Sequence, residues 1–157
     1  MSTIGGPEIV SDGLVFLLDA ANTKSYPGSG TSITDVVGNV SGDLINGPTF
    51  DSANNGSIVF DGVNDYIDCN NISSINSLTS LTISIWCKKD DSGDVVGVNT
   101  IKDVSNDKIL LYNWTNNTVY FGVRNGATNG SPAYALSHDS NYHNYTGVYK
   151  GGISLEL

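Results

Sequence analysis

Cysteine, charged residues and long apolar runs are all scarce in this chain of 157 residues. Its only cysteines are Cys69 and Cys87, so no disulfide framework staples the fold, and we expect two half-buried thiols in neighbouring strands. No stretch approaches the roughly 20 consecutive apolar residues of a membrane-spanning helix, so we expect no membrane insertion. The N-terminal sequence lacks the basic segment and the apolar segment that together mark a secretory signal peptide.

Basic residues are scarcer still. Seven Lys and Arg stand against sixteen Asp and Glu, a net charge of −9, and this balance argues against nucleic acid as a partner. Charged residues make up 15% of the chain, against roughly 25% in an average globular protein. The hydrophobic fraction of 39% is nevertheless too high for a disordered acidic chain. The length suits a single folded domain over residues 1–157.

What the chain does contain is a series of short strand signals separated by turns rich in Gly, Asn, Asp and Ser. Residues 81–88 alternate strictly between apolar and polar, the period of a half-buried strand. Residues 108–114 and 118–124 predict a hairpin around a turn at 115–117. Further strand signals lie at 14–18, 58–60, 66–69, 94–103, 142–149 and 153–157. Residues 22–57 are predicted to be mostly loop, with a short helical turn near 74–78, so the pattern predicts an all-β sandwich.

Five segments, in order along nearly the whole chain, are similar to the laminin-G-like, concanavalin A-like jelly-roll domains. They are GLVFLLDAANTKSYPGSG (13–30), GNVSGDLINGPTF (38–50), SIVFDGVNDYIDC (57–69), LTISIWCK (81–88) and NYHNYTGVYKGGISLEL (141–157). The resemblance implies an all-β fold, a jelly-roll sandwich of two antiparallel sheets. In such domains the last segment is followed by further strands, so by resemblance about the last quarter of the fold is missing after Leu157.

A shortened sandwich of this kind would expose a sheet edge, and exposed edges invite pairing. Three explanations are open. The chain is a fragment, a partner chain supplies the missing strands, or a homo-oligomer buries the edge.

Catalytic chemistry finds little support in the sequence. Glycoside hydrolysis needs two carboxylates facing each other across the scissile bond, and jelly-roll glucanases of the resembling class carry Glu-x-Asp-x-Glu on one strand. Here Glu occurs only at Glu8 and Glu156, and the clearest strand signals, 81–87 and 108–114, carry no acid. No nucleophile elbow or phosphate-binding loop is present, so we predict that the protein is not an enzyme.

One turn has the composition of a metal site. Asp61, Asn64 and Asp65 cluster in the turn FDGVND, and Ca²⁺ takes carboxylate, amide and backbone oxygens as ligands. Concanavalin A-like folds often bind calcium at one rim, so these three residues are the candidate Ca²⁺ ligands. The alternative is that their side chains cap their own backbone, as Asp and Asn do in tight turns.

Exposed aromatic rings beside amides and acids are the chemistry of glycan binding. If the apolar residues of the predicted hairpin fill the core, its other face presents Tyr112, Trp114, Tyr120 and Arg124, and Trp86 lies with the polar face of its own strand. These five residues are the candidate glycan-binding set. The alternative is that the aromatics cover the second sheet face or a subunit contact.

The resemblance extends to domains on bacteriophage virions. It implies a non-enzymatic structural and attachment protein, in a capsid decoration, head fibre or tail fibre, located on the virion surface after assembly in the host cytoplasm. Its expected partners are other virion proteins or copies of itself, and a cell-surface glycan. The alternative is an extracellular carbohydrate-binding module of a larger secreted bacterial protein.

Overall fold

The structure is a computed structural model of the 157-residue chain. It describes residues 10–38, 40–75, 78–89, 96–101, 108–113, 118–125, 128–130, 133–135, 140–150 and 154–156. The chain divides into two compact units, Met1–Ser74 and Ile75–Leu157. The organisation of residues 1–157 as a single domain stays a prediction.

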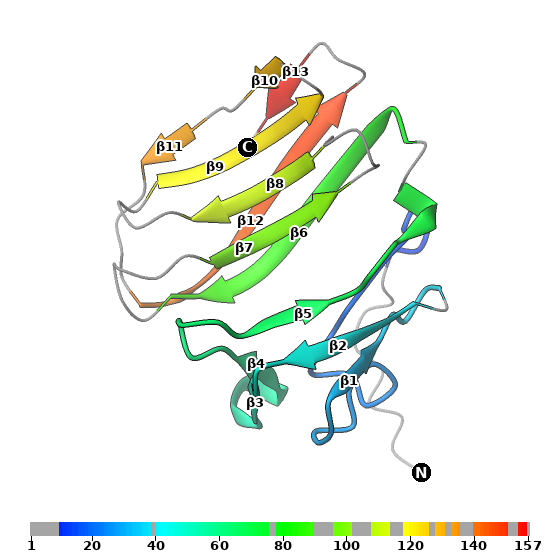
Figure 1. Ribbon diagram of the computed structural model, residues 1–157, viewed down its shortest axis with the longest axis vertical. Coiled ribbons are helices and arrows are strands. Elements are labelled where there is room, and N and C mark those ends of the chain that lie inside the picture. Colours follow the sequence, from blue (N-terminus) through cyan, green and yellow to red (C-terminus); the bar gives the residue numbers. More distant parts are fainter. Residues whose placement is uncertain are drawn as a thin grey trace. The chain divides into compact units, whose positions relative to one another are not determined.

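The first unit contains two small antiparallel sheets (Figure 1). One sheet has the order β1-β2-β5, formed by β1 (Ser32–Thr34), β2 (Ser41–Ile45) and β5 (Tyr66–Asp68). The other pairs β3 (Thr49–Asp51) with β4 (Ser57–Val59), joined across the short 3₁₀ helix η1 (Ala53–Asn55). All of these strands are three to five residues long, so packing beneath the sheets must supply most of the stability.

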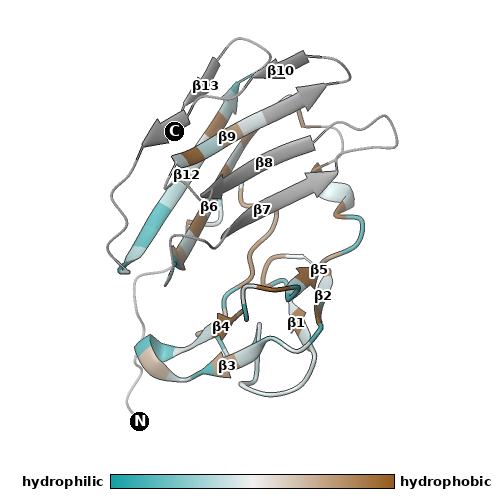
Figure 2. Cartoon of the chain, turned by 60° about the vertical axis from the view of Figure 1, so that its left-hand side comes forward, coloured by the Kyte–Doolittle hydropathy of each residue, from teal (hydrophilic) through white to brown (hydrophobic). Residues whose placement is uncertain are grey.

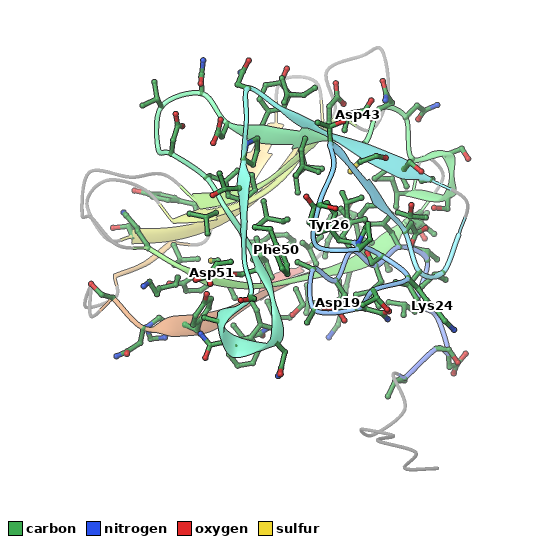
Figure 3. The ribbon with its side chains drawn as sticks, turned by 90° about the horizontal axis from the view of Figure 1, so that it is seen from below. Asp19, Lys24, Tyr26, Asp43, Phe50 and Asp51 are labelled. Atoms are coloured by element: carbon green, nitrogen blue, oxygen red, sulfur yellow. The ribbon has the colours of Figure 1, made fainter. Side chains whose placement is uncertain are left out.

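That packing is centred on three buried side chains, those of Tyr26, Ile33 and Leu44. The half-buried side chains packed against them are Leu18, Phe50, Ile58 and Ile67. The rings of Tyr26 and Phe50 lie close together (Figure 3), with centroids 5.5 Å apart and planes tilted by 52°. The Tyr26 hydroxyl donates to the Gly30 carbonyl at 2.8 Å, which satisfies the polar end of a buried ring.

The predicted strand at residues 14–18 is wrong, since the structure assigns no strand there. The reason lies in Asp35, a buried residue whose carboxylate accepts the backbone N–H of Leu17 at 2.8 Å. The Leu17 carbonyl accepts the N–H of Val36 at 2.9 Å. Both backbone groups of Leu17 are thus paired with a side chain and a loop instead of a neighbouring strand.

The second unit contains two larger antiparallel sheets. One has the order β13-β12-β6, formed by β6 (Ser80–Lys88), β12 (Tyr142–Lys150) and β13 (Ser154–Glu156). In the other, β7 (Val96–Ile101), β8 (Lys108–Asn113) and β9 (Thr118–Asn125) run side by side (Figure 1). The far edge of β9 pairs in turn with β10 (Thr128–Gly130) and β11 (Ala133–Ala135). A second 3₁₀ helix, η2 (Ser73–Ile75), spans the division between the units.

The two sheets of the second unit face each other across a shared core. Val119 and Phe121 of β9 are fully buried, and the side chains packed against them come from β6 and β12: Leu81, Ile83, Ile85, Tyr145 and Tyr149. Figure 2 shows apolar residues recurring along β6 and at the start of β9. The two sheets approach closely at Gly147 of β12, where a Cβ atom would lie 2.5 Å from Phe121 Cγ. Only glycine leaves room for that ring.

The all-β prediction is confirmed, because the described elements are antiparallel strands and two 3₁₀ helices. The strands expected near residues 58, 66, 81, 108, 118, 142 and 153 are all present, as is the helical turn near Ser74. Most described residues of 22–57 are loop, as predicted, but the short strands β1, β2 and β3 also lie there and were not predicted. None of the described residues belongs to a helix long and apolar enough to cross a membrane.

Candidate functional site

The candidate site is one face of the β6–β12 strand pair. The two strands are antiparallel and in register over nine pairs, from Tyr142 opposite Lys88 to Lys150 opposite Ser80. Side chains alternate across a strand, and the odd-numbered residues of β6 point into the core. The even-numbered residues form what we call the outer face: Ser80, Thr82, Ser84, Trp86, Lys88, Tyr142, Asn144, Thr146, Val148 and Lys150.

Two large aromatic rings stand on this outer face. Trp86 is 71% exposed and Tyr142 is 41% exposed. Trp86 follows Ile85, which packs in the core, so the pleat of β6 directs the indole away from the core. The indole offers a large apolar surface with a polar N–H, and the neighbouring Tyr142 adds a second exposed ring on the same face.

A closed network of side-chain hydrogen bonds lies beside the indole. Asn144, the cross-strand partner of Trp86, donates from Nδ2 to Ser84 Oγ at 2.9 Å. Thr146 Oγ1 donates to Asn144 Oδ1 at 2.8 Å, and the Thr146 and Ser84 hydroxyl oxygens lie 3.0 Å apart. The network holds the Asn144 amide in one orientation while these exposed polar groups keep further capacity for hydrogen bonds.

None of the ten outer-face residues is an acid, although acids outnumber basic residues in the whole chain. In the register of the neighbouring strand β13, Glu156 is the partner of Val148. The charged members of the outer face are Lys88 and Lys150, one at each end of the paired strands. Between them lie neutral hydroxyl, amide, aromatic and aliphatic side chains. Chemically, this surface can stack on a ring and exchange hydrogen bonds with hydroxyl groups.

The structure divides the predicted glycan-binding set between two sheets. Trp86 lies in β6, while Tyr112 and Tyr120 are directly paired in β8 and β9, and Arg124 lies further along β9. Because the residues on either side of Tyr120 fill the core, Tyr120 belongs to the face of β9 that points away from β6 and β12. Trp86 and Tyr120 therefore lie on opposite sides of the second unit. Trp114 lies outside the described residues.

The polar partners of Trp86 went unrecognised in the sequence. Ser84 and Asn144 are 60 residues apart, and only the pairing of β6 with β12 brings them together. The available signal was a partial alternation of residues 142–150, less regular than that of residues 80–88. Matching two alternating segments predicts that they pair but does not give their register.

The candidate calcium turn joins β4 to β5 in the first unit. Asp61 Oδ1 accepts the backbone N–H groups of Val63 at 2.8 Å and Asn64 at 3.3 Å, and Asp65 Oδ2 accepts that of Asp61 at 3.1 Å. The Asn64 carbonyl accepts from Asn46 Nδ2 at 2.7 Å. The hydrogen bond from Val63, with weaker ones from neighbouring backbone groups, lowers the pKa of the Asp61 carboxyl.

The oxygens that would bind Ca²⁺ are thus largely engaged in capping the turn. One oxygen, Asp65 Oδ1, is buried without a hydrogen-bond partner. Within the part of the chain that the structure describes, no group of three or more His, Cys, Asp or Glu side chains is placed to hold a metal ion. Calcium binding by Asp61, Asn64 and Asp65 stays a prediction.

Both cysteines are free thiols that are half-buried in the structure. Burial raises the pKa of Cys87 to about 11, and burial together with nearby carboxylates raises the pKa of Cys69. Cys87 is the cross-strand partner of His143, whose ring stacks on Tyr145 with centroids 6.1 Å apart. A reactive cysteine needs a lowered pKa, and burial shifts the pKa of Cys87 in the opposite direction.

No protein-family model, no curated protein sequence and no solved structure matches this chain. The laminin-G-like resemblance therefore rests on its five segments alone. A functional assignment has to start from the chemistry of the outer face.

Proposed function

We propose that this protein is a non-enzymatic attachment module that binds glycans through the outer face of β6 and β12. The observation that carries the proposal is the exposed indole of Trp86 beside the hydrogen-bonded trio of Ser84, Asn144 and Thr146. A sugar ring has an apolar face of C–H groups and a rim of hydroxyls. An aromatic ring beside fixed amide and hydroxyl groups complements both.

The size of the indole sets the scale of the interaction. A tryptophan can bury about 150–250 Å², so an exposure of 71% leaves roughly 150 Å² available to a ligand. Covering about half of that area at about 25 cal/mol per Å² contributes about 2 kcal/mol. Losing this contribution would raise Kd about 30-fold, so a weak glycan complex would depend on this one residue.

The carboxylates support a role without catalysis. Asp35 and Asp61 accept backbone N–H groups and hold turns in place. Glycoside hydrolysis needs two facing carboxylates, whereas the ten outer-face residues include no acid and the register of β13 brings one, Glu156, opposite Val148. We therefore propose that these groups hold a bound sugar without cleaving it.

For the setting of this module, we propose a concanavalin A-like jelly roll on the surface of a bacteriophage virion, with other virion proteins or further copies of the chain as partners. The five laminin-G-like segments and the acidic, Asn-, Ser- and Thr-rich composition support this choice. A carbohydrate-binding module of a secreted bacterial protein is the alternative. Electron microscopy of the assembly distinguishes them, since the virion proposal requires symmetric copies on a larger particle.

The binding proposal is tested by glycan-array screening followed by calorimetry on the sugars that bind. We expect Trp86→Ala to weaken binding about 30-fold. Tyr66→Ala is the matched control, because Tyr66 is a 50% exposed aromatic residue in the first unit, and it should leave the affinity unchanged. No binding of the wild-type protein to any glycan, or equal losses in both variants, would refute the proposal.

A further inference from the structure

The outer face carries a second aromatic ring, and its position relative to Trp86 bears on the kind of glycan that fits. Asn144 lies directly opposite Trp86, and Tyr142 lies two residues from Asn144 on the same face of β12. Tyr142 is therefore the diagonal neighbour of Trp86. Diagonal neighbours on an antiparallel pair are about 7–8 Å apart, within reach of large aromatic side chains.

This spacing exceeds what one sugar ring covers. A single pyranose stacked on the indole of Trp86 would leave most of the Tyr142 ring uncovered, whereas the next sugar of a chain would reach it. On the other side of Trp86, the hydroxyls of Ser84 and Thr146 continue the same row of outer-face positions. Because successive outer-face pairs are about 7 Å apart along the strands, the row from Tyr142 to Ser84 spans about two to three sugar units.

The row has exposed residues along both strands. Ser80, Thr82, Ser84, Trp86 and Lys88 of β6 are all exposed, and so are Tyr142, Asn144 and Lys150 of β12. The two least exposed members, Thr146 and Val148, are still only half-buried. An exposed row of this kind favours contact with the side of a chain over enclosure of a chain end.

We propose that the ligand is the interior of a linear β-linked polysaccharide lying along the strands, with one sugar on Trp86 and the next on Tyr142. This inference rests on the glycan-binding function proposed above and adds the ligand class and the second contact. β-1,4-Linked pyranoses extend as flat ribbons that present ring faces to a surface. Tyr142 is then a specificity-determining residue for chain length.

The test measures affinity against chain length with defined probes. Calorimetry would use oligosaccharides of one to six units from four β-1,4-linked series, those of glucose, mannose, xylose and N-acetylglucosamine. For at least one series we expect affinity to rise from one to three units and then level off. The step contributed by Tyr142 is about fivefold, from covering about half of its exposed area.

Variants separate the two rings. Tyr142→Ala should remove the gain on chain extension while leaving monosaccharide binding unchanged, and Tyr142→Phe should keep the gain because the ring remains. Trp86→Ala should weaken binding at every length. Circular dichroism of each variant verifies that it is folded, and the wild-type length profile is decisive even where a variant fails to fold.

The possible results separate failure of the linear-chain inference from failure of the proposed glycan-binding function. If array sugars bind through Trp86 but none of the four series binds, or if affinity does not depend on length, glycan binding stands and the linear-chain inference is refuted. Binding that requires a terminal or branched sugar refutes it in the same way. If no glycan binds at all, the proposed function fails and this inference fails with it.

Discussion

Replacing Gly147 by alanine tests the close approach of β12 to Phe121 in the second unit. Gly147 lies in β12 opposite Ile83 of β6, and its Cα faces the ring of Phe121 in the other sheet. A Cβ atom added there would lie 2.5 Å from Phe121 Cγ and 2.6 Å from Cε2. A normal carbon–carbon contact is about 3.5–4.0 Å, so the ring would have to move by about 1 Å or more.

The surroundings of Phe121 resist that movement. The ring is fully buried, with side chains of β6 and β12 packed against it. Overpacking a closed core costs about 1–3 kcal/mol, and the severity of this overlap places it near the upper end. The loss of unfolded-chain entropy on going from glycine to alanine offsets about 0.4–1 kcal/mol. The expected destabilisation of Gly147→Ala is therefore about 2 kcal/mol.

Urea denaturation followed by circular dichroism measures this change. With a slope of about 2 kcal/mol per molar urea, the midpoint should fall by about 1 M. The matched variant is Phe121→Leu, which removes the ring that Gly147 faces. In the double variant the two effects should be less than additive, because the smaller side chain leaves room for the new methyl group. An unchanged midpoint for Gly147→Ala, or strict additivity in the double variant, would show that the sheets do not meet as described.

Two further predictions concern buried polar groups. Asp35→Ala should lower the free energy of unfolding, measured by urea denaturation, by about 3 kcal/mol. The reason is that the N–H groups of Leu17, Val37 and Gly38 all donate to the Asp35 carboxylate. Asp35→Asn keeps one of the accepting oxygens and should cost less, so equal losses in the two variants would contradict this role. Cys87, with its pKa raised from 9.0 to about 11, should react with iodoacetamide at pH 8 about 100-fold more slowly in the folded protein than in urea. The thiol ionises at a lower pH in the unfolded chain than in the folded protein. The contribution of Cys87 to the stability of the fold should therefore be complete below about pH 8.5 and decline as the pH rises toward 11. Equal labelling rates in both states would refute the assignment.

Strands with a buried face were the part of the fold most accessible from sequence. In β6 the apolar residues recur at every second position over nine residues, and the structure buries that same set. The strand signal is local, because the pleat alone decides which residues share a face. For the same reason the alternation placed Trp86 correctly on the polar face of its strand.

Strands of three residues are predicted from sequence only where an apolar run marks them, as at residues 58–60. β1 and β3 lie in a segment that reads as loop, since three residues are too few to show a period. The opposite error occurred at residues 14–18, where an apolar run indicated a strand. There the backbone partner is the carboxylate of Asp35, 18 residues from Leu17, and composition does not reveal such a pairing.

The amino-acid sequence by itself determined the all-β class, the inward and outward faces of its longer strands, and the polar character of the surface. These follow from composition and from a two-residue period, which act over neighbouring residues. Only the tertiary structure decided which exposed residues share a surface. Register brings Asn144 opposite Trp86, and sheet packing places Tyr120 on the far side of the unit. Both depend on contacts between distant segments, because a shift of one residue in register would exchange the faces of β12.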